Sequence, residues 1–342
     1  MLLQDIWFFL WGLLWAVYFI TDGFDLGIGS LMPFLGKDED SRKVMVTAMG
    51  PLWDGNEVWL LTAGGVTFAA FPKVYAVMFS TLYSPLMIIL FALILRGVSL
   101  EFRGHIDSPG WKKLWDTCLF LGSLLPAILF GAAFANIFRG IPFDQTAVFQ
   151  GNLFTLLNPY GLLGGILFLL LFLIHGANWL AIKSDGDLHR RAINTGKVLW
   201  PILLAVAVIF LGATYVSTPL YNNYFNSPAL FLVVLITVLA LLGIRVFLGS
   251  NSPGKAWVAS ALTIVGATFF GVIGLYPNMY PSIINPIYNL TAHNASSTPL
   301  TLKIMLTVAV IFVPIVLIYQ FWAYMLFKGK ITKDDLNYEE GH

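Results

Sequence analysis

The feature that most constrains this chain is a series of nine long apolar segments separated by short polar connections. Most of them reach the ~20 residues that a helix needs to cross the hydrocarbon core of a bilayer. Only 11% of the residues are charged, whereas about a quarter are charged in a soluble domain. We therefore predict an all-α integral membrane protein with about nine transmembrane helices, at Trp7–Met32, Met49–Phe71, Val74–Ile94, Leu114–Phe138, Leu162–Ile182, Val198–Val216, Ala229–Phe247, Trp257–Tyr276 and Ile304–Phe327.

The Lys and Arg residues give this series an orientation. All but three of the 19 fall at alternate connections, beginning with the one after the first segment, and the exceptions are Lys73, Arg139 and Lys303. Connections rich in Lys and Arg stay on the cytoplasmic side. We expect the N-terminus outside and the C-terminus in the cytoplasm, in a multi-pass protein of the bacterial cytoplasmic (inner) membrane.

The chain is expected to form one polytopic membrane domain over residues 1–342, with approximate halves 1–140 and 160–276 and an extra helix at 304–327. Its first segment lacks the positively charged start and the cleavage pattern of a signal peptide. The single cysteine, Cys118, supports neither a disulfide framework nor a thiolate metal site. No basic patch with interleaved aromatic residues suggests nucleic-acid binding.

Two acidic pairs lie inside the apolar segments. Asp22 and Asp25 occur in Thr21-Asp-Gly-Phe-Asp-Leu-Gly27, and Asp54 and Glu57 occur in Trp53-Asp-Gly-Asn-Glu-Val-Trp59. Residues three apart share a helix face, so each pair should point in one direction. Ionisable side chains are costly in a bilayer and usually mark function. The predicted orientation places all four acids in the cytoplasmic half of two neighbouring helices.

Close carboxylates in a low dielectric cannot all ionise. The four acids are therefore predicted to form a proton-uptake path from the cytoplasm, with Asp25 and Asp54 ahead of Asp22 and Glu57. The alternative is a structural role, as helix caps or as partners of Arg96 and Lys43. Judged on the residues alone, a proton-coupled secondary transporter fits as well as a respiratory subunit.

Arg96, Glu101 and His175 are candidate supporting residues of the site. Arg96 and Glu101, at the inner end of the third segment, are expected to favour interfacial positions and surface pairing over a site. His175 lies late in the fifth segment, where a hydrogen-bonded packing histidine is favoured over a haem ligand or a proton relay. No His/Cys spacing predicts a metal site, and no motif predicts a catalytic nucleophile in this chain.

At the same acidic motifs the chain resembles subunit II of the cytochrome bd quinol oxidases. The resemblance runs over essentially the whole chain, and its motifs occur in the family's order and spacing. They are Thr21–Gly27, Trp53–Leu60, Ala63-Gly-Gly65, Phe68-Ala-Ala-Phe-Pro72, Gly151-Asn-Leu-Phe154, Leu157-Asn-Pro-Tyr-Gly161, Asn294-Ala-Ser296 and Gly329-Lys-Ile-Thr-Lys-Asp-Asp335.

The resemblance implies a fold of two four-helix bundles plus one peripheral helix. It implies a non-haem-ligating subunit of a heterodimer that couples quinol oxidation to dioxygen reduction to water in the aerobic respiratory chain. Two haem b and one haem d would reside in subunit I, with a membrane quinol as the substrate. Subunit II would support assembly and proton delivery, in an electrogenic enzyme without a pump. The chain alone is then expected to be inactive, and a small single-helix subunit is a further expected partner.

Two positions depart from the family pattern. Residue 57 is Glu, where many members carry Gln, which argues against Glu57 as an essential proton carrier. The connection at Ser217–Pro228 is also short for the family, so a partner or quinone contact through a longer loop is not expected there.

Overall fold

The structure is a computed structural model that describes residues 2–332 and residue 336. Lys333, Asp334 and Asp335 of the family-like tail lie outside the described residues. Long helices dominate, and two short strands pair in one connection. In chain order the elements are α1 Leu2–Leu35, α2 Glu39–Met49, α3 Trp53–Ala70, α4 Pro72–Thr81, α5 Tyr83–Phe102, α6 Pro109–Arg139, α7 Leu153–Leu156, α8 Pro159–Lys183, α9 Gly186–Ser217, α10 Tyr221–Asn226, η1 Pro228–Leu230, α11 Phe231–Gly249, α12 Pro253–Leu275, β1 Asn278–Tyr280, η2 Pro286–Tyr288, β2 Leu290–Thr291 and α13 Pro299–Leu326.

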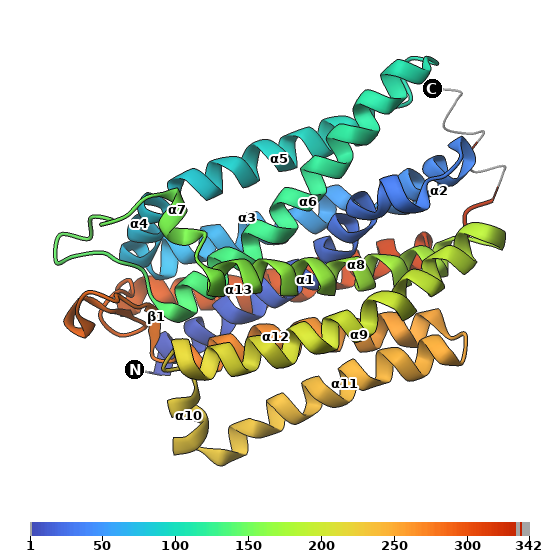
Figure 1. Cartoon of the computed structure of the whole chain (residues 1–342). Helices are drawn as coiled ribbons and strands as arrows, with labels where there is room; N and C mark the ends of the chain where they lie inside the picture. Colours follow the sequence, from blue (N-terminus) through green and yellow to red (C-terminus); the bar gives the residue numbers. More distant parts are fainter. Residues whose placement is uncertain (1, 333–335, 337–342) are drawn as a thin grey trace.

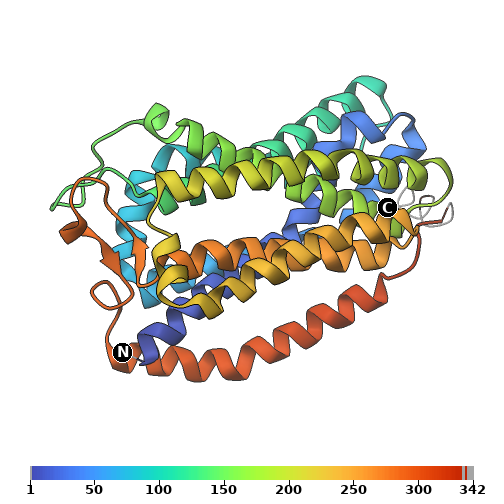
Figure 2. The same cartoon turned by 60° about the horizontal axis from the view of Figure 1, so that its bottom comes forward.

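The long helices run side by side in two groups (Figure 1). In the first group α1 packs against α3 and α6, and α5 packs against α6; in the second, α8 packs against α9 and α12, and α11 against α9 and α12. The groups are joined by α6, which packs against α8, and by α1, which also contacts α8 and α12. Helix α13 lies along the outside of the bundle (Figure 2). The arrangement agrees with the expected two four-helix bundles and one peripheral helix.

Eight helices in the described part of the chain are long and apolar enough to cross a membrane. Helix α3, with 18 residues and both Asp54 and Glu57, is not among them. It nevertheless packs beside α1 at the place of the second predicted segment. Nine crossings, with the predicted orientation, therefore remain a prediction.

The third predicted segment, Val74–Ile94, is wrong in its bounds. The structure divides this stretch into α4 and α5, with Leu82 between the two helices. Pro85 lies in the first turn of α5, where its missing N–H leaves no helical hydrogen bond unmade. A helix continuous from Val74 would place Pro85 in its interior and break it, so the membrane-length helix begins at Tyr83.

Glycines allow the two groups to approach closely at the level of the acids. A Cβ atom on Gly27 of α1 would overlap the backbone carbonyl of Phe172, and one on Gly176 of α8 would press on the backbone of α1 at Ile28. Small residues at such crossings let helix backbones come together in membrane proteins. This contact fixes α1 in the centre of the molecule.

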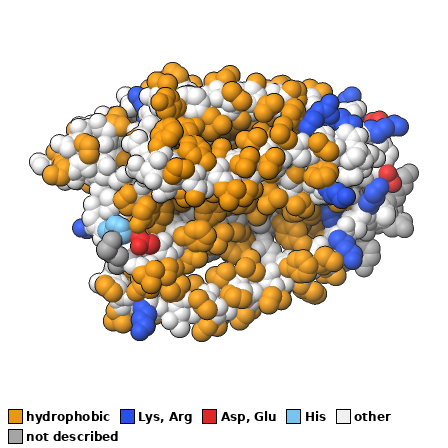
Figure 3. Space-filling view, turned by 90° about the horizontal axis from the view of Figure 1, so that it is seen from below, with side chains coloured by type: hydrophobic (Ala, Val, Ile, Leu, Met, Phe, Trp, Pro, Cys, Tyr) orange, Lys and Arg blue, Asp and Glu red, His pale blue; other side chains and the backbone are white. Residues whose placement is uncertain are grey.

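The basic side chains gather at one end of an apolar surface (Figure 3). This end carries the last turns of α1 and α5, the α8–α9 connection and the end of α13 (Figures 1 and 2). The opposite end is covered by the connections around Gly140–Tyr160 and Pro277–Leu302, which contact each other where Ile141 donates to the Pro281 carbonyl. The asymmetry matches the charge pattern from which the orientation was predicted.

Candidate functional site

Asp22 and Asp25 both lie inside the long helix α1, one turn apart. Both side chains are fully buried, as are Asn56 of α3 and Arg96 of α5, each 0% exposed. They lie in the half of α1 that is nearer to the basic end, and α3 begins and α5 ends at the same level. Three helices therefore bring polar side chains together inside an otherwise apolar bundle.

Arg96 is the cation of this cluster. Its Nη2 lies 2.7 Å from Asp22 Oδ1 and 2.5 Å from Glu57 Oε1, so it connects α5 with α1 and α3. The side chain of Glu57 is 24% exposed, whereas Asp22 is completely enclosed. The expectation of an interfacial Arg96 is wrong: pairing with two carboxylates offsets part of the cost of burying the guanidinium. Asp22 and Glu57 thus have the partner, Arg96, that the structural alternative named for the acids.

Asp25 has a different partner. Asn56 Nδ2 donates to Asp25 Oδ2 at 2.7 Å, and Asp25 Oδ1 is buried with no hydrogen-bond partner among the described residues. Asp25 forms no ion pair with Arg96 in the described structure. One guanidinium faces three carboxyl groups, so the cluster has fewer positive charges than carboxyls and can hold a proton.

Helix α13 completes the cluster with two side chains. Gln320 Nε2 and Tyr324 Oη both donate to Asn56 Oδ1, at 3.3 and 2.8 Å. Trp59 Nε1 of α3 donates to Gln320 Oε1 at 2.7 Å. Asn56 is therefore held between Asp25 on one side and α13 on the other.

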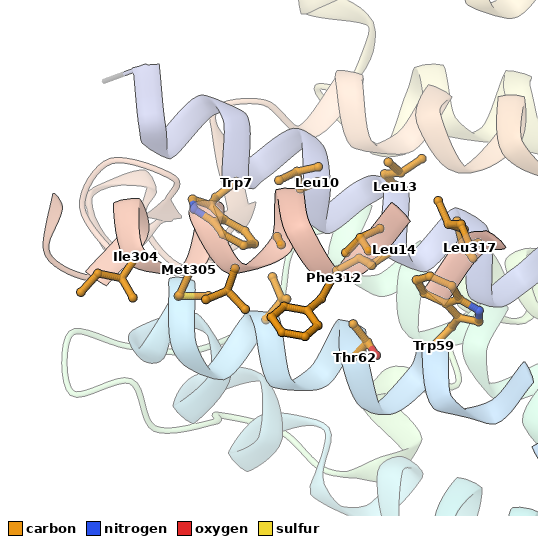
Figure 4. Close-up of a pocket in the computed structure, with 15 residues that line it drawn as sticks. Trp7, Leu10, Leu13, Leu14, Trp59, Thr62, Ile304, Met305, Phe312 and Leu317 are labelled. Carbon is orange, nitrogen blue, oxygen red and sulfur yellow. The ribbon is translucent and has the colours of Figure 1, made fainter. Parts of the chain in front are cut away.

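An apolar cleft of about 420 Å³ lies between α1, α3 and the part of α13 from Ile304 to Leu317 (Figure 4). Thr62 is the one polar residue of its lining, and its hydroxyl donates to the Val58 carbonyl. Trp59 stands at one end of the cleft and Trp7 near the other (Figure 4). The cleft offers no charged or unpaired polar group to a ligand and ends at the Trp59–Gln320 contact.

Asp54 does not join the buried cluster, contrary to the prediction that all four acids lie together. Its residue is exposed in the first turn of α3. Successive residues of an α-helix turn by about 100°, so Asp54 is about 200° from Asn56 around the helix axis. Because Asn56 faces Asp25, Asp54 must face outward.

His175 and Glu101 lie apart from the cluster. His175 is fully buried in α8; its Nδ1 lies 2.7 Å from Ser260 Oγ and its Nε2 2.9 Å from the Ile20 carbonyl. With both ring nitrogens engaged, and the ring stacked on Trp257, His175 has the contacts of a packing histidine. Glu101 is exposed near the end of α5. Within residues 2–332 and 336, no group of three or more His, Cys, Asp or Glu side chains could hold a metal ion.

Sequence reasoning missed Asn56, Gln320 and Tyr324. Asn56 stands between the two acids of its own motif, and it was passed over because it carries no charge. Gln320 and Tyr324 are four residues apart near the end of the C-terminal helix, so they share one face. An amide side chain in a membrane-length helix was the available signal for this contact.

A second ionic cluster lies at the basic end. Arg103, which follows α5, donates from Nε to Asp116 Oδ1 at 2.6 Å and from Nη1 and Nη2 to Glu39 Oε1 and Oε2, both at 3.0 Å. Partial burial alone would raise the pKa of Glu39, but the hydrogen bonds and charge of Arg103 outweigh it and lower that pKa. This cluster fastens α2 to α5 and α6.

Comparisons with known proteins agree with the motifs and the fold. A sequence model of the family described as cytochrome bd terminal oxidase subunit II matches residues 3–327. The chain is 35% identical to the cytochrome bd-I ubiquinol oxidase subunit 2 of Escherichia coli K12, over 98% of this chain and 96% of that protein. It is 36% identical to the cytochrome bd ubiquinol oxidase subunit 2 of Bacillus subtilis, over 98% and 99%.

A probable cytochrome oxidase subunit 2 from Haemophilus influenzae is 37% identical over 96% of this chain and 95% of its own length. Among solved structures, a chain of the bd oxidase from Geobacillus thermodenitrificans shares the fold, with a TM-score of 0.79 at 18% identity over 96% of this chain and 99% of that one. The family match spans nearly the whole chain, including both acidic motifs and the α13 residues that reach them. This chain therefore belongs to the cytochrome bd terminal oxidase subunit II family.

Proposed function

We propose that this chain is the subunit of a quinol oxidase that carries protons from the cytoplasm toward the oxygen-reducing centre in a partner subunit. The observation that supports this role is Asp25, a fully buried carboxyl group that, unlike Asp22 and Glu57, forms no ion pair in the described structure. Asp22 and Glu57 are engaged by Arg96. Asp25 is thus the member of the cluster that is best placed to gain and lose a proton.

Asp54 takes a different place in the proposed path. It is exposed in the first turn of α3, at the level of the basic end, so it can exchange protons with water or with a group on the partner. Asp25 then acts as the inner acceptor. Asp22, Glu57 and Arg96 keep the cluster folded and set the charge around Asp25.

The remaining expectations from the family concern the complex. The family resemblance implies that the haems, two of b type and one of d type, belong to subunit I, and this assignment is supported by His175, the buried histidine among the described residues, whose two ring nitrogens are both engaged. These groups would supply the redox chemistry, and this chain would hold a proton at Asp25. The protons that form water are taken from the cytoplasm, which makes the enzyme electrogenic without a pump. The chain alone is inactive. A small single-helix subunit is a further partner of the complex. The cytoplasmic (inner) membrane is the proposed location. A stand-alone proton-coupled transporter is not favoured by the family match.

Purification of the assembled complex with Asp25→Asn and Asp54→Asn variants tests this function. We expect both variants to co-purify with the haem-bearing partner, because neither acid forms an ion pair in the described structure. Quinol oxidase turnover should fall at least tenfold for Asp25→Asn and less for Asp54→Asn, in line with a positioned proton-transfer group. Glu101→Gln, at an exposed position, is the matched control. Full turnover of the assembled Asp25→Asn complex would contradict the proposal.

A further inference from the structure

Helix α13 is the least embedded helix of membrane length in the described structure. Of its 28 residues, Leu302 is the one that is buried. The apolar cleft separates it from α1 and α3 over much of its length. Yet two of its polar side chains, Gln320 and Tyr324, reach the buried cluster and both contact Asn56. These two contacts are the ones that connect this loosely packed helix with the buried cluster in the described structure.

Hydrogen bonds connect Trp59, Gln320, Asn56 and Asp25 in series, and Trp59 determines which group donates at each step. An indole N–H can only donate, so the contact of Trp59 Nε1 requires the oxygen of Gln320 to face α3. The nitrogen of Gln320 then faces Asn56, and the Tyr324 hydroxyl adds a second donor to the same Asn56 oxygen. Asn56 must therefore present its NH₂ group, and not its oxygen, to Asp25.

This orientation acts on the proton at Asp25. A donor directed at a carboxyl oxygen favours the ionised form, whereas an amide oxygen in the same place would favour the protonated form. With Oδ2 occupied by Asn56, the unpartnered Oδ1 is the atom left to receive a proton. The charged groups around Asp25 are Asp22 of α1, Glu57 of α3 and Arg96 of α5. His175 of α8 is hydrogen-bonded elsewhere, and Tyr324 is the titratable neighbour from α13.

We propose that Gln320 and Tyr324 of α13 are positioning residues for Asp25, acting through the amide of Asn56. They touch neither Asp25 nor any reacting group in the described structure. Their task is to keep the Asn56 amide in the one orientation that favours the carboxylate. The proposal rests on the proposed role of Asp25 and adds that the peripheral helix sets the pH range in which this acid exchanges protons.

The test uses the assembled, purified oxidase and the variant Gln320→Leu/Tyr324→Phe, which removes both donors to Asn56. The Asn56 amide can then turn its oxygen toward Asp25. The carboxyl infrared band of Asp25, identified by its loss in Asp25→Asn, is followed against pH. We expect its midpoint, and the limb of the turnover profile that reports it, to move to higher pH by roughly one unit, the size expected for the loss of one hydrogen bond. Tyr319→Phe, an exposed tyrosine on the same helix, should leave the midpoint unchanged.

The same double substitution in an Asn56→Leu complex distinguishes an effect that acts through the Asn56 amide from a nonspecific structural effect. In an Asn56→Leu complex there is no amide to orient, so adding Gln320→Leu/Tyr324→Phe should shift the midpoint no further. Equal shifts in both backgrounds, or no shift in the parent, would overturn the proposal. If the double variant does not assemble, Tyr324→Phe alone, which loses one hydroxyl, is measured in the same two backgrounds. Full turnover in Asp25→Asn would contradict the proton path, while the infrared midpoint would still decide the role of α13.

Discussion

Arg96 and Arg103 lie two turns apart on the same face of α5, and each joins carboxylates from two other helices. Arg103, at the basic end, uses all three nitrogens to bind Asp116 of α6 and Glu39 of α2. Arg96, inside the bundle, approaches both of its carboxylates with Nη2 alone, and its Nε and Nη1 have no hydrogen-bond partner among the described residues.

The difference between the two arginines lies in how completely their hydrogen-bonding groups are paired. Around Arg103 the described hydrogen bonds occupy every guanidinium nitrogen, which is the arrangement that stabilises a fold. Around Arg96 a third carboxyl, Asp25, stands outside the ion pairs, and polar atoms remain unpartnered although they are buried. Such incompletely satisfied buried groups cost stability and usually have a functional reason. Similar residue types therefore form a fully hydrogen-bonded cluster at one level and, about 10 Å away along the helix axis, the cluster for which we propose proton transfer.

The largest effect is expected from Arg96→Met. This change leaves Asp22 and Glu57 without their cation inside the bundle, and breaking a buried pair in this way costs about 3–5 kcal/mol. We expect the complex not to accumulate in the membrane, as measured by haem content and by co-purification of both subunits. Adding Asp22→Asn and Glu57→Gln should restore part of the yield. Normal accumulation of Arg96→Met would remove the distinction between the two arginines.

Arg103→Met should weaken the complex without changing its chemistry. The ion pairs of Arg103 are partly exposed, since the side chain of Glu39 is 37% exposed, and the expected cost is about 1–3 kcal/mol for the lost charged hydrogen bonds. A lower thermal midpoint with unchanged quinol oxidase turnover per assembled complex is the predicted result. A large loss of turnover at normal stability would show that the outer cluster also takes part in proton transfer.

Glu57→Gln should change turnover less than twofold. The carbonyl oxygen of Gln can still accept the hydrogen bond from Arg96. Although one negative charge is lost, Arg96 keeps Asp22 as an anionic partner. Steady-state turnover and thermal stability of the purified complex are the measurements. A tenfold loss of turnover would place Glu57 beside Asp25 as a proton carrier.

The smallest effect concerns acid stability at the outer cluster. Because the folded pKa of Glu39 is held below its ordinary value of 4.5, its stabilising contribution is present above that value. The contribution is lost as the pH falls through the lower, folded pKa. When the pH is lowered below 4.5, we expect the thermal midpoint of the parent complex to decrease more than the thermal midpoint of the Glu39→Gln complex. Parallel curves would show that the Arg103–Glu39 pair contributes nothing to stability.

Most of the fold was predictable because apolar length and the Lys and Arg pattern report directly on the bilayer. The break between α4 and α5 was not predicted, although Ser80, Thr81 and Pro85 interrupt the apolar run there. The site was predicted in part. The i,i+3 spacing of Asp22 and Asp25 correctly indicated a shared buried face.

The remainder of the site depends on contacts between distant segments. The pairing of Arg96 with Asp22 joins residues 74 positions apart, and no spacing within one helix could show which face of α5 turns inward. The same is true of Asn56 and Tyr324, which come from opposite ends of the chain. The position predicted for Asp54 was wrong because the i,i+3 rule gives only the direction of Asp54 relative to Glu57. The rule does not say which side of the helix is turned toward the centre of the bundle.

Proton uptake by the reconstituted complex tests the central claim most directly. Parent, Asp25→Asn and Glu57→Gln complexes in vesicles would be compared for the rate of proton uptake during dioxygen reduction, with haem content as the measure of assembly. The account predicts uptake slowed at least tenfold in Asp25→Asn and nearly unchanged in Glu57→Gln. Unchanged uptake in an assembled Asp25→Asn complex would contradict it.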